Sequence, residues 1–296
     1  MQILNLTRHA LAGGALTLAM AAAHATALVG LSDTNMLLRF DSAAPGSATA
    51  VAITGMASGE SIVSIDFRNP DNTLYGLSSA GNLYALNAAT GSASLLGTGL
   101  VPALTAGVSY EIDWNPSNNN LRVIGSASAP NTNRAYTFTT GVTAVQTALS
   151  FASGTGSPDV VGAAYASNFA GSPAATLSLY TIDALTDALY INTNAFAGGV
   201  LTKVADLTLG GFAFGVNNPA GFEITASGEA YVSWRENLYA INLATAALTP
   251  LGSIGPNFNV IGLTSVSAVP EPQTDALMGL GLLAFGARAW RRRSAT

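Results

Sequence analysis

Short apolar runs separated by turn-forming residues fill the chain between residues 28 and 268. The runs are four to seven residues long, rich in β-branched and aromatic residues, and bounded by Gly, Asn, Asp or Ser, as strands are. Helical periodicity is not sustained anywhere in this part of the chain. In residues 82–87, Leu83 and Tyr84 point to opposite faces of one strand, and both are apolar. Such strands need a sheet on each side, so the pattern predicts an all-β fold of stacked sheets.

The strand pattern repeats along the chain. Residues 28–41 align without a gap to residues 74–87, and residues 82–97 are similar in sequence to residues 237–252. Equivalent residues recur about every 48 positions, within the roughly 40 to 50 residues of β-propeller repeats. One unit reads as four strands joined by tight turns. The repeat therefore predicts a β-propeller built from four-stranded blades.

Five repeat units are expected, and one of them is split between the two ends of the chain. A segment at residues 260–266 supplies the inner strand of the split blade, and residues 28–55 supply its other three strands. Pairing the two ends closes the ring and hides the edges of an open sheet. The alternative architecture is a large β-sandwich or a β-solenoid, which would not explain the completed first unit. The other four inner strands are expected near residues 61–67, 108–114, 160–166 and 221–226.

The N-terminal residues have the pattern of a secretory signal peptide. Arg8 and His9 precede an apolar run at residues 10–23, and Ala25, Thr26 and Ala27 then form a small-x-small sequence. The run is shorter than the roughly 20 residues that span a bilayer. We therefore expect signal peptidase to cut after Ala27, leaving a mature chain that begins at Leu28.

The C-terminal residues combine a Pro-Glu-Pro element, an apolar segment at residues 276–287, and an arginine cluster. The element is Pro270, Glu271 and Pro272, and the cluster is Arg291, Arg292 and Arg293. Together they resemble the PEP-CTERM sorting signal of exported Gram-negative proteins. The resemblance implies a short tail helix, cleavage by an exosortase, transient anchoring in the inner membrane with the arginines on the cytoplasmic side, and display at the cell surface or in the extracellular matrix. An ordinary C-terminal membrane anchor or a frayed amphipathic tail is the alternative.

Three regions are therefore expected: a signal peptide (1–27), a propeller-like repeat domain (28–268) and a sorting tail (269–296). Residues 64–70 and 83–91 carry the two alternating repeat elements. In these elements the domain resembles a family of exported bacterial proteins of unassigned function. The resemblance implies no catalytic residue.

The composition of residues 28–268 limits the kinds of partner and of catalytic or metal site that the domain can have. This region has six basic and fourteen acidic residues, a net charge of −8, which argues against nucleic acid as a partner. The chain has no cysteine, and its two histidines, His9 and His24, precede residue 28. Catalytic triads and thiolate or imidazole zinc sites are therefore excluded. The sites that are still possible are acid–base catalysis by carboxylates and the binding of a hard cation such as calcium by oxygen ligands.

Three carboxylates recur at one position of the repeat: Asp66, Asp113 and Glu223, with Ala164 and Gly262 at that position in the other two units. Inner strands line the channel of a propeller, so these carboxylates could converge there on a calcium ion or a polar ligand. Alternatively, each caps its own turn or pairs with a neighbour such as Arg68. Glu111 shares a strand face with Asp113, but nothing in the sequence raises the pKa of either group.

Two main hypotheses for function follow. The first is a non-catalytic, surface- or matrix-associated propeller without a resident cofactor that binds polysaccharide or protein partners. The second is a carboxylate- or calcium-dependent hydrolase or lyase that acts on extracellular polymer. A purely structural matrix component is a third hypothesis. We rank them in this order, because the absence of histidine and cysteine reduces the range of enzyme chemistry.

Overall fold

The structure is a computed structural model that describes residues 25–266 with short gaps, at 98, 107, 127–131, 167–176, 193–197, 218 and 256–257. The predicted signal peptide up to His24, and the predicted sorting tail with its helix, lie outside the described residues. A search of the described part of the chain found no helix with the length and hydropathy of a membrane span.

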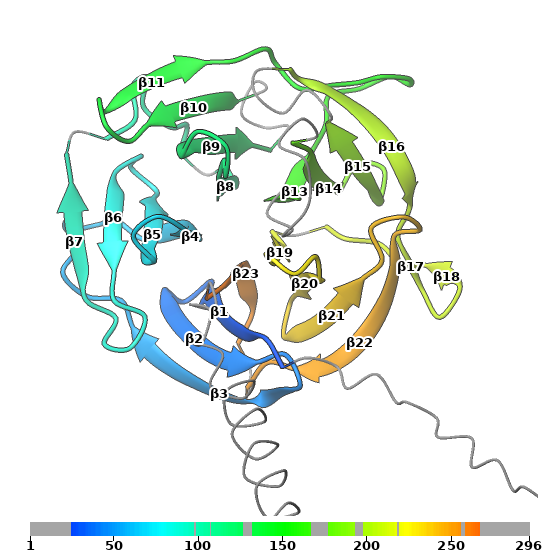
Figure 1. Cartoon of the computed structure of the whole chain (residues 1–296), viewed down its shortest axis with the longest axis horizontal. Coiled ribbons are helices and arrows are strands. Elements are labelled where there is room, and N and C mark those ends of the chain that lie inside the picture. The colour runs from blue at the N-terminus through cyan, green and yellow to red at the C-terminus, as the bar shows by residue number, and fades with distance from the viewer. Residues whose placement is uncertain are drawn as a thin grey trace, which may run out of the picture.

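Five sheets stand around a central axis as the blades of a propeller (Figure 1). Blade 1 contains β23 (Val260–Ser265), β1 (Ala27–Ser32), β2 (Met36–Asp41) and β3 (Ala44–Ala52). Blade 2 contains β4 (Ile62–Arg68), β5 (Thr73–Ser78), β6 (Leu83–Leu86) and β7 (Ala93–Leu96). Blade 3 contains β8 (Tyr110–Trp114), β9 (Asn120–Gly125), β10 (Asn133–Thr137) and β11 (Val142–Val145). The propeller prediction is confirmed, and the sandwich and solenoid alternatives are wrong.

Blades 4 and 5 gain outer strands that the repeat did not predict. Blade 4 contains β13 (Val160–Tyr165), β14 (Leu179–Asp183), β15 (Ala188–Asn192), β16 (Val200–Asp206) and β12 (Ser150–Phe151). Blade 5 contains β19 (Gly221–Ile224), β20 (Ala230–Trp234), β21 (Asn237–Ile241), β22 (Ala247–Ser253), β17 (Thr208–Leu209) and β18 (Phe212–Ala213). β12 and β17 pair in parallel with the outer strands β16 and β22. Each precedes the inner strand of its blade, so the chain covers the blade's exposed edge on its way to the axis.

The two ends of the domain pair as predicted. β1 pairs with β2 on one side and with β23 on the other, both antiparallel, and Leu28 lies opposite Ser265. β23 is thereby the inner strand of a blade whose other three strands come from the start of the chain (Figure 1). The ring is closed by hydrogen bonds within one sheet, which leaves no open edge between the first and last segments.

Among the described residues, the core forms five apolar clusters, one at each contact between neighbouring blades. Leu83 packs in the cluster between blades 2 and 3, whereas Tyr84, the next residue, packs in the cluster between blades 1 and 2. Both side chains are buried. Both faces of the strand are apolar because each blade packs against a neighbouring blade on both sides, as predicted.

Candidate functional site

The three recurrent carboxylates come together at the axis. Asp66 on β4, Asp113 on β8 and Glu223 on β19 each place one carboxylate oxygen within 4.8 Å of the other two. Their strands are the inner strands of blades 2, 3 and 5. The predicted convergence in the channel is therefore found. We name these three residues the axial cluster.

Each carboxylate of the axial cluster also accepts a backbone hydrogen bond from the next inner strand around the ring. Asp66 Oδ2 accepts from Trp114 N at 2.7 Å, and Asp113 Oδ2 accepts from Tyr165 N at 3.3 Å. The Ser265 hydroxyl and backbone N–H both donate to Glu223. The recurrent acid therefore links one blade to the next, which differs from the expectation that it caps its own turn.

Threonine makes the equivalent link at the closure of the ring. Thr264 Oγ1 accepts from Phe67 N at 3.2 Å and donates to Asp66 Oδ1 at 2.8 Å. By this contact Thr264, and not Gly262, is the residue of blade 1 equivalent to Asp66. The sequence alignment placed Gly262 at this position and was wrong by two residues. The β-bulge between Val260 and Gly262 matches the one between Ile62 and Ser64, so Gly262 corresponds to Ser64. At the step from blade 4 to blade 5 the equivalent residue is Ala164, whose methyl group accepts no hydrogen bond.

Arg68 does not neutralise the axial cluster. Its guanidinium pairs with Asp71, with 2.5 Å between Arg68 Nη1 and Asp71 Oδ2, and stacks on the rings of Trp114 and Phe138. The expected pairing of a recurrent acid with Arg68 is therefore wrong. Neither of the two ion pairs found within the described residues involves a member of the axial cluster.

Burial shifts the ionisation of the axial cluster strongly. The residues are 7%, 9% and 7% exposed in chain order. Burial raises the pKa of Asp66 to about 7, against the partial offset of its hydrogen bonds from Trp114 and Thr264. Burial and the neighbouring charge of Asp66 raise the pKa of Glu223 to about 8. The pKa of Asp113 is also well above its ordinary range, because of burial and then the charges of Asp66 and Glu223.

Glu111 adds a fourth buried carboxyl group close to the cluster. It precedes Asp113 by two residues on β8, so both side chains leave the same face of the strand. Glu111 is 4% exposed, and its Oε1 atom has no hydrogen-bond partner. Burial raises its pKa well above the ordinary range, although a hydrogen bond from Ser64 opposes the shift. Burial is therefore the cause of the raised pKa values of Glu111 and Asp113, which the sequence did not reveal.

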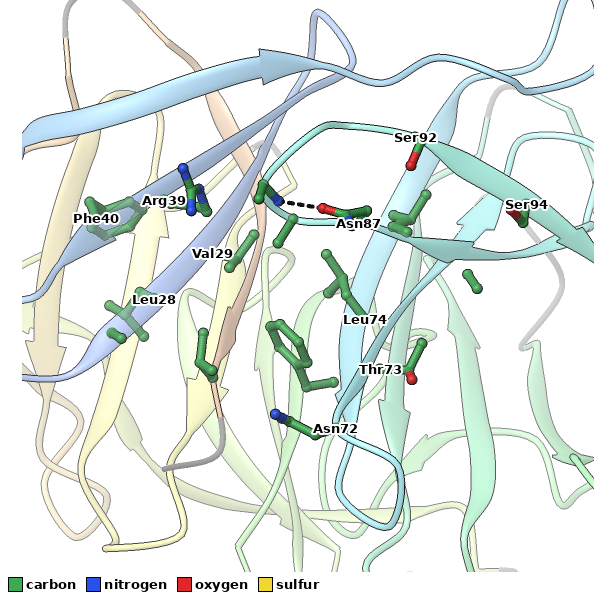
Figure 2. A pocket seen from close by; sticks show the side chains of 17 residues that line it. Leu28, Val29, Arg39, Phe40, Asn72, Thr73, Leu74, Asn87, Ser92 and Ser94 are labelled. Carbon is green, nitrogen blue, oxygen red and sulfur yellow. Dashed lines mark hydrogen bonds between the residues drawn. The ribbon is translucent and has the colours of Figure 1, made fainter. Parts of the chain in front are cut away.

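A groove of about 750 Å³ lies between blades 1 and 2 (Figure 2). Its apolar floor includes the half-buried residues Phe67, Ala85 and Ala88, whereas Leu28, Val29 and Leu74 also line it but are almost completely buried. Figure 2 shows Arg39 on the blade 1 side and Thr73 and Ser94 on the blade 2 side. Six polar residues line it: Arg39, Asn72, Thr73, Asn87, Ser92 and Ser94. Sequence reasoning missed this groove, because its two walls come from different repeats.

A second groove of about 570 Å³ lies on the other side of blade 1, where blade 5 meets it. Its lining includes Ser42 from blade 1 and Glu229 and Tyr231 from blade 5. Both grooves are bordered by turns that follow inner or middle strands, so they open toward the same face of the ring. Blade 1, which closes the ring, is therefore flanked by a groove on each side.

Comparisons with known proteins agree with this organisation. A family model described as "Domain of unknown function (DUF4394)" matches residues 36–264. A model described as the "PEP-CTERM protein-sorting motif" matches residues 268–293, which confirms the sorting tail. The motif implies export, processing by exosortase and membrane-associated sorting in a Gram-negative bacterium. No curated protein matches the sequence.

Two solved structures from Bacteroides species are similar at low identity. A structural genomics protein of unknown function from Bacteroides thetaiotaomicron VPI-5482 is 12% identical, with a TM-score of 0.44, over 81% of this chain and 56% of that one. An auxiliary nutrient binding protein from Bacteroides ovatus ATCC 8483 is 14% identical, with a TM-score of 0.43, over 69% of this chain and 55% of that one. The match thus spans little more than half the length of these proteins.

Proposed function

Because the chain belongs to the family described as a domain of unknown function (DUF4394), a description that assigns no activity, we propose a function from its geometry. The protein is an exported, non-catalytic β-propeller that binds an extracellular polysaccharide in the groove between blades 1 and 2. The observation that carries the proposal is the lining of that groove, where hydroxyl, amide and guanidinium groups surround an apolar floor. The site of action is the cell surface or the extracellular matrix.

The chemistry of the groove matches that of a sugar chain. Sugar rings present hydroxyl groups at their edges and C–H groups on their faces, so they need hydrogen-bonding side chains around an apolar surface. Here Asn72 and Ser94 supply polar groups, and the Phe67 ring lies among the lining residues. Arg39 is exposed and supplies a cation that can donate two parallel hydrogen bonds to a uronate carboxylate. A protein partner is the competing occupant.

The placement of the acids favours binding over hydrolysis. A glycosidase needs two carboxyl groups that reach the scissile bond of a polymer. Asp66 and Asp113 are less than a tenth exposed, and each already accepts a hydrogen bond from the backbone of a neighbouring blade. Little of either carboxylate is therefore open to an extended polymer. The carboxylate-dependent hydrolase or lyase is therefore the weaker proposal.

Replacing Arg39 by alanine should weaken polysaccharide binding at least about 10-fold, because a hydrogen-bonded charge contributes roughly 1.5 to 3 kcal/mol. Calorimetry with alginate oligosaccharides tests acidic chains, and dextran oligosaccharides test neutral ones. Lys203→Ala is the matched control, since Lys203 is an exposed cation that pairs with Asp206 on blade 4. Failure of both probes to bind, or binding that Arg39→Ala leaves unchanged, would contradict the proposal.

We also propose that the axial cluster is the place where a divalent cation such as Ca²⁺ binds. Calcium takes carboxylate oxygens at about 2.3 to 2.6 Å, so oxygens up to roughly 5 Å apart can share one ion. Three acids from three blades meet this condition, and the unpartnered Oε1 of buried Glu111 leaves the same face of β8 as Asp113. The ion would tie blades 2, 3 and 5 together.

Adding Ca²⁺ to the chelator-treated full-length protein at pH 8 should raise the melting temperature by several degrees, since the ion binds the folded state alone. Asp113→Asn should remove most of this rise, because the amide lacks the charge that holds the ion. Asp41→Asn is the control, since Asp41 caps an exposed turn through Ala43 N in blade 1. If wild-type protein melts at the same temperature with and without Ca²⁺, the cluster holds protons only and the cation proposal fails.

A further inference from the structure

Thr26 is an integrated part of the fold, although it precedes the expected start of the mature chain. Thr26 N donates to Ser42 Oγ at 3.0 Å, and Ser42 N donates to Thr26 O at 2.9 Å. Thr26 Oγ1 donates to Glu229 Oε2 at 2.9 Å and lies 3.1 Å from Tyr231 Oη. Ser42 belongs to blade 1, whereas Glu229 and Tyr231 belong to blade 5. Thr26 therefore bridges the two blades that close the ring.

Ala27 is also engaged. It is the first residue of β1, where it pairs with Asp41, and its carbonyl oxygen accepts from Val266 N at 3.0 Å. That bond extends the pairing of the two chain ends by one step beyond the strands. Cleavage after Ala27 would remove every contact of Thr26 and Ala27 from the mature protein, and would leave Ser42 N and Val266 N without these acceptors.

The sequence contains a second small-x-small pattern two residues earlier, and a third, Ala21 to Ala23, that lies entirely within the apolar run. Ala23 and Ala25 flank His24 in the same way that Ala25 and Ala27 flank Thr26. Signal peptidase reads small residues at these two positions, so the sequence pattern accepts either site. The contacts of the folded domain distinguish the cuts after Ala25 and after Ala27, because only the cut after Ala25 keeps Thr26 and Ala27. A cut after Ala23 would also keep them, but it would fall at the end of the apolar run itself.

We infer that signal peptidase cuts between Ala25 and Thr26, so that the mature chain begins at Thr26 rather than at Leu28. The cut converts the backbone N–H of Thr26 into an ammonium group at the seam between blades 1 and 5. Glu229, whose carboxylate already accepts from Thr26 Oγ1, is the acid beside this new charge. The charged end thus lies next to Ser42, Glu229 and Tyr231, which line the second groove.

The test expresses the full-length chain in a Gram-negative host and reads the N-terminus of the exported protein by sequencing and intact mass. The expected N-terminal sequence is Thr26, Ala27, Leu28. A matched pair of variants separates the two sites: Ala23→Leu should block most processing, whereas Ala27→Leu should leave it unchanged. An N-terminus at Leu28, or a block by Ala27→Leu and not by Ala23→Leu, would overturn the inference.

Stability provides a second readout. A chain engineered for release at Leu28 should melt several degrees below the chain that begins at Thr26, because it lacks the bridge between blades 1 and 5. Equal melting temperatures would show that the contacts of Thr26 and Ala27 contribute nothing to the closed ring, and would remove the structural reason for the earlier cleavage site.

Discussion

The Gly221→Ala variant should lose about 3 kcal/mol of unfolding free energy, because an added methyl group would push apart the inner strands of blades 5 and 1. A Cβ atom at Gly221 would lie 2.4 Å from Ser233 Oγ, 2.6 Å from Leu263 Cβ and 2.6 Å from the backbone carbon of Gly262. Gly262 and Leu263 belong to β23, the inner strand of blade 1. A backbone carbon cannot rotate away as a side chain can, so β19 and β23 would have to separate.

Denaturant unfolding of Gly221→Ala beside Gly46→Ala measures this effect. Gly46 lies on β3 at the outer edge of blade 1, and the nearest atom to an added Cβ there is Ser253 O at 3.7 Å. The control should therefore stay within about 1 kcal/mol of the wild type. Similar midpoints for both variants would mean that the contact between β19 and β23 is looser than the structure shows.

The protein should become less stable as the pH rises from 5 to 9 in a buffer that contains a chelator. The pKa values of Asp66 and Glu223 are about 7 and about 8 in the folded state, against ordinary values of 3.8 and 4.5. The folded protein therefore binds more protons than the unfolded chain in this range, and its stability falls as those protons leave. Asp66 alone accounts for a loss of roughly 3 kcal/mol between pH 5 and pH 9, or about 6 to 12 °C in melting temperature, and Glu223 adds to this loss.

Thermal melts at pH 5, 7 and 9 test this direction. Asp113 and Glu111 face the same region from β8, and burial raises the pKa of both, so they act in the same sense. Asp66→Asn should flatten the profile, because it removes one titrating group and lowers the charge that Glu223 and Asp113 experience. A melting temperature that rises steadily from pH 5 to pH 9 would contradict the protonation of the buried acids.

Much of the fold was predictable because the strand pattern of one blade recurs along the sequence. The alternation at Leu83 and Tyr84 predicted sheets on both sides, and the split unit at residues 28–55 and 260–266 predicted ring closure. Both are confirmed by the apolar clusters and by the pairing of β1 with β23. The extra strands β12, β17 and β18 were missed, since two-residue pairings carry no periodicity that a sequence pattern can show.

The candidate site was only partly predictable. The recurrence of Asp66, Asp113 and Glu223 at one position of the repeat predicted that their side chains meet at the axis, because equivalent residues of a closed ring lie at equivalent distances from its axis. Their bonding to the next blade was not predictable, since Trp114 N and Tyr165 N are backbone donors that every residue type supplies. The equivalence of Thr264 was missed because blade 1 has no acid at this position to guide the alignment, and because Thr264 too bonds a backbone donor, Phe67 N.

Residue identity and spacing along the chain are enough to establish the class of fold, the repeat unit, the sorting tail and the types of chemistry available. Which carboxylates lose their water, which backbone groups they accept from, and where two repeats enclose a groove depend on how the blades pack. Burial and distance between residues far apart in the chain are properties of packing. They arise only when separate repeats meet, as Thr26 and Glu229 do at the seam of the ring.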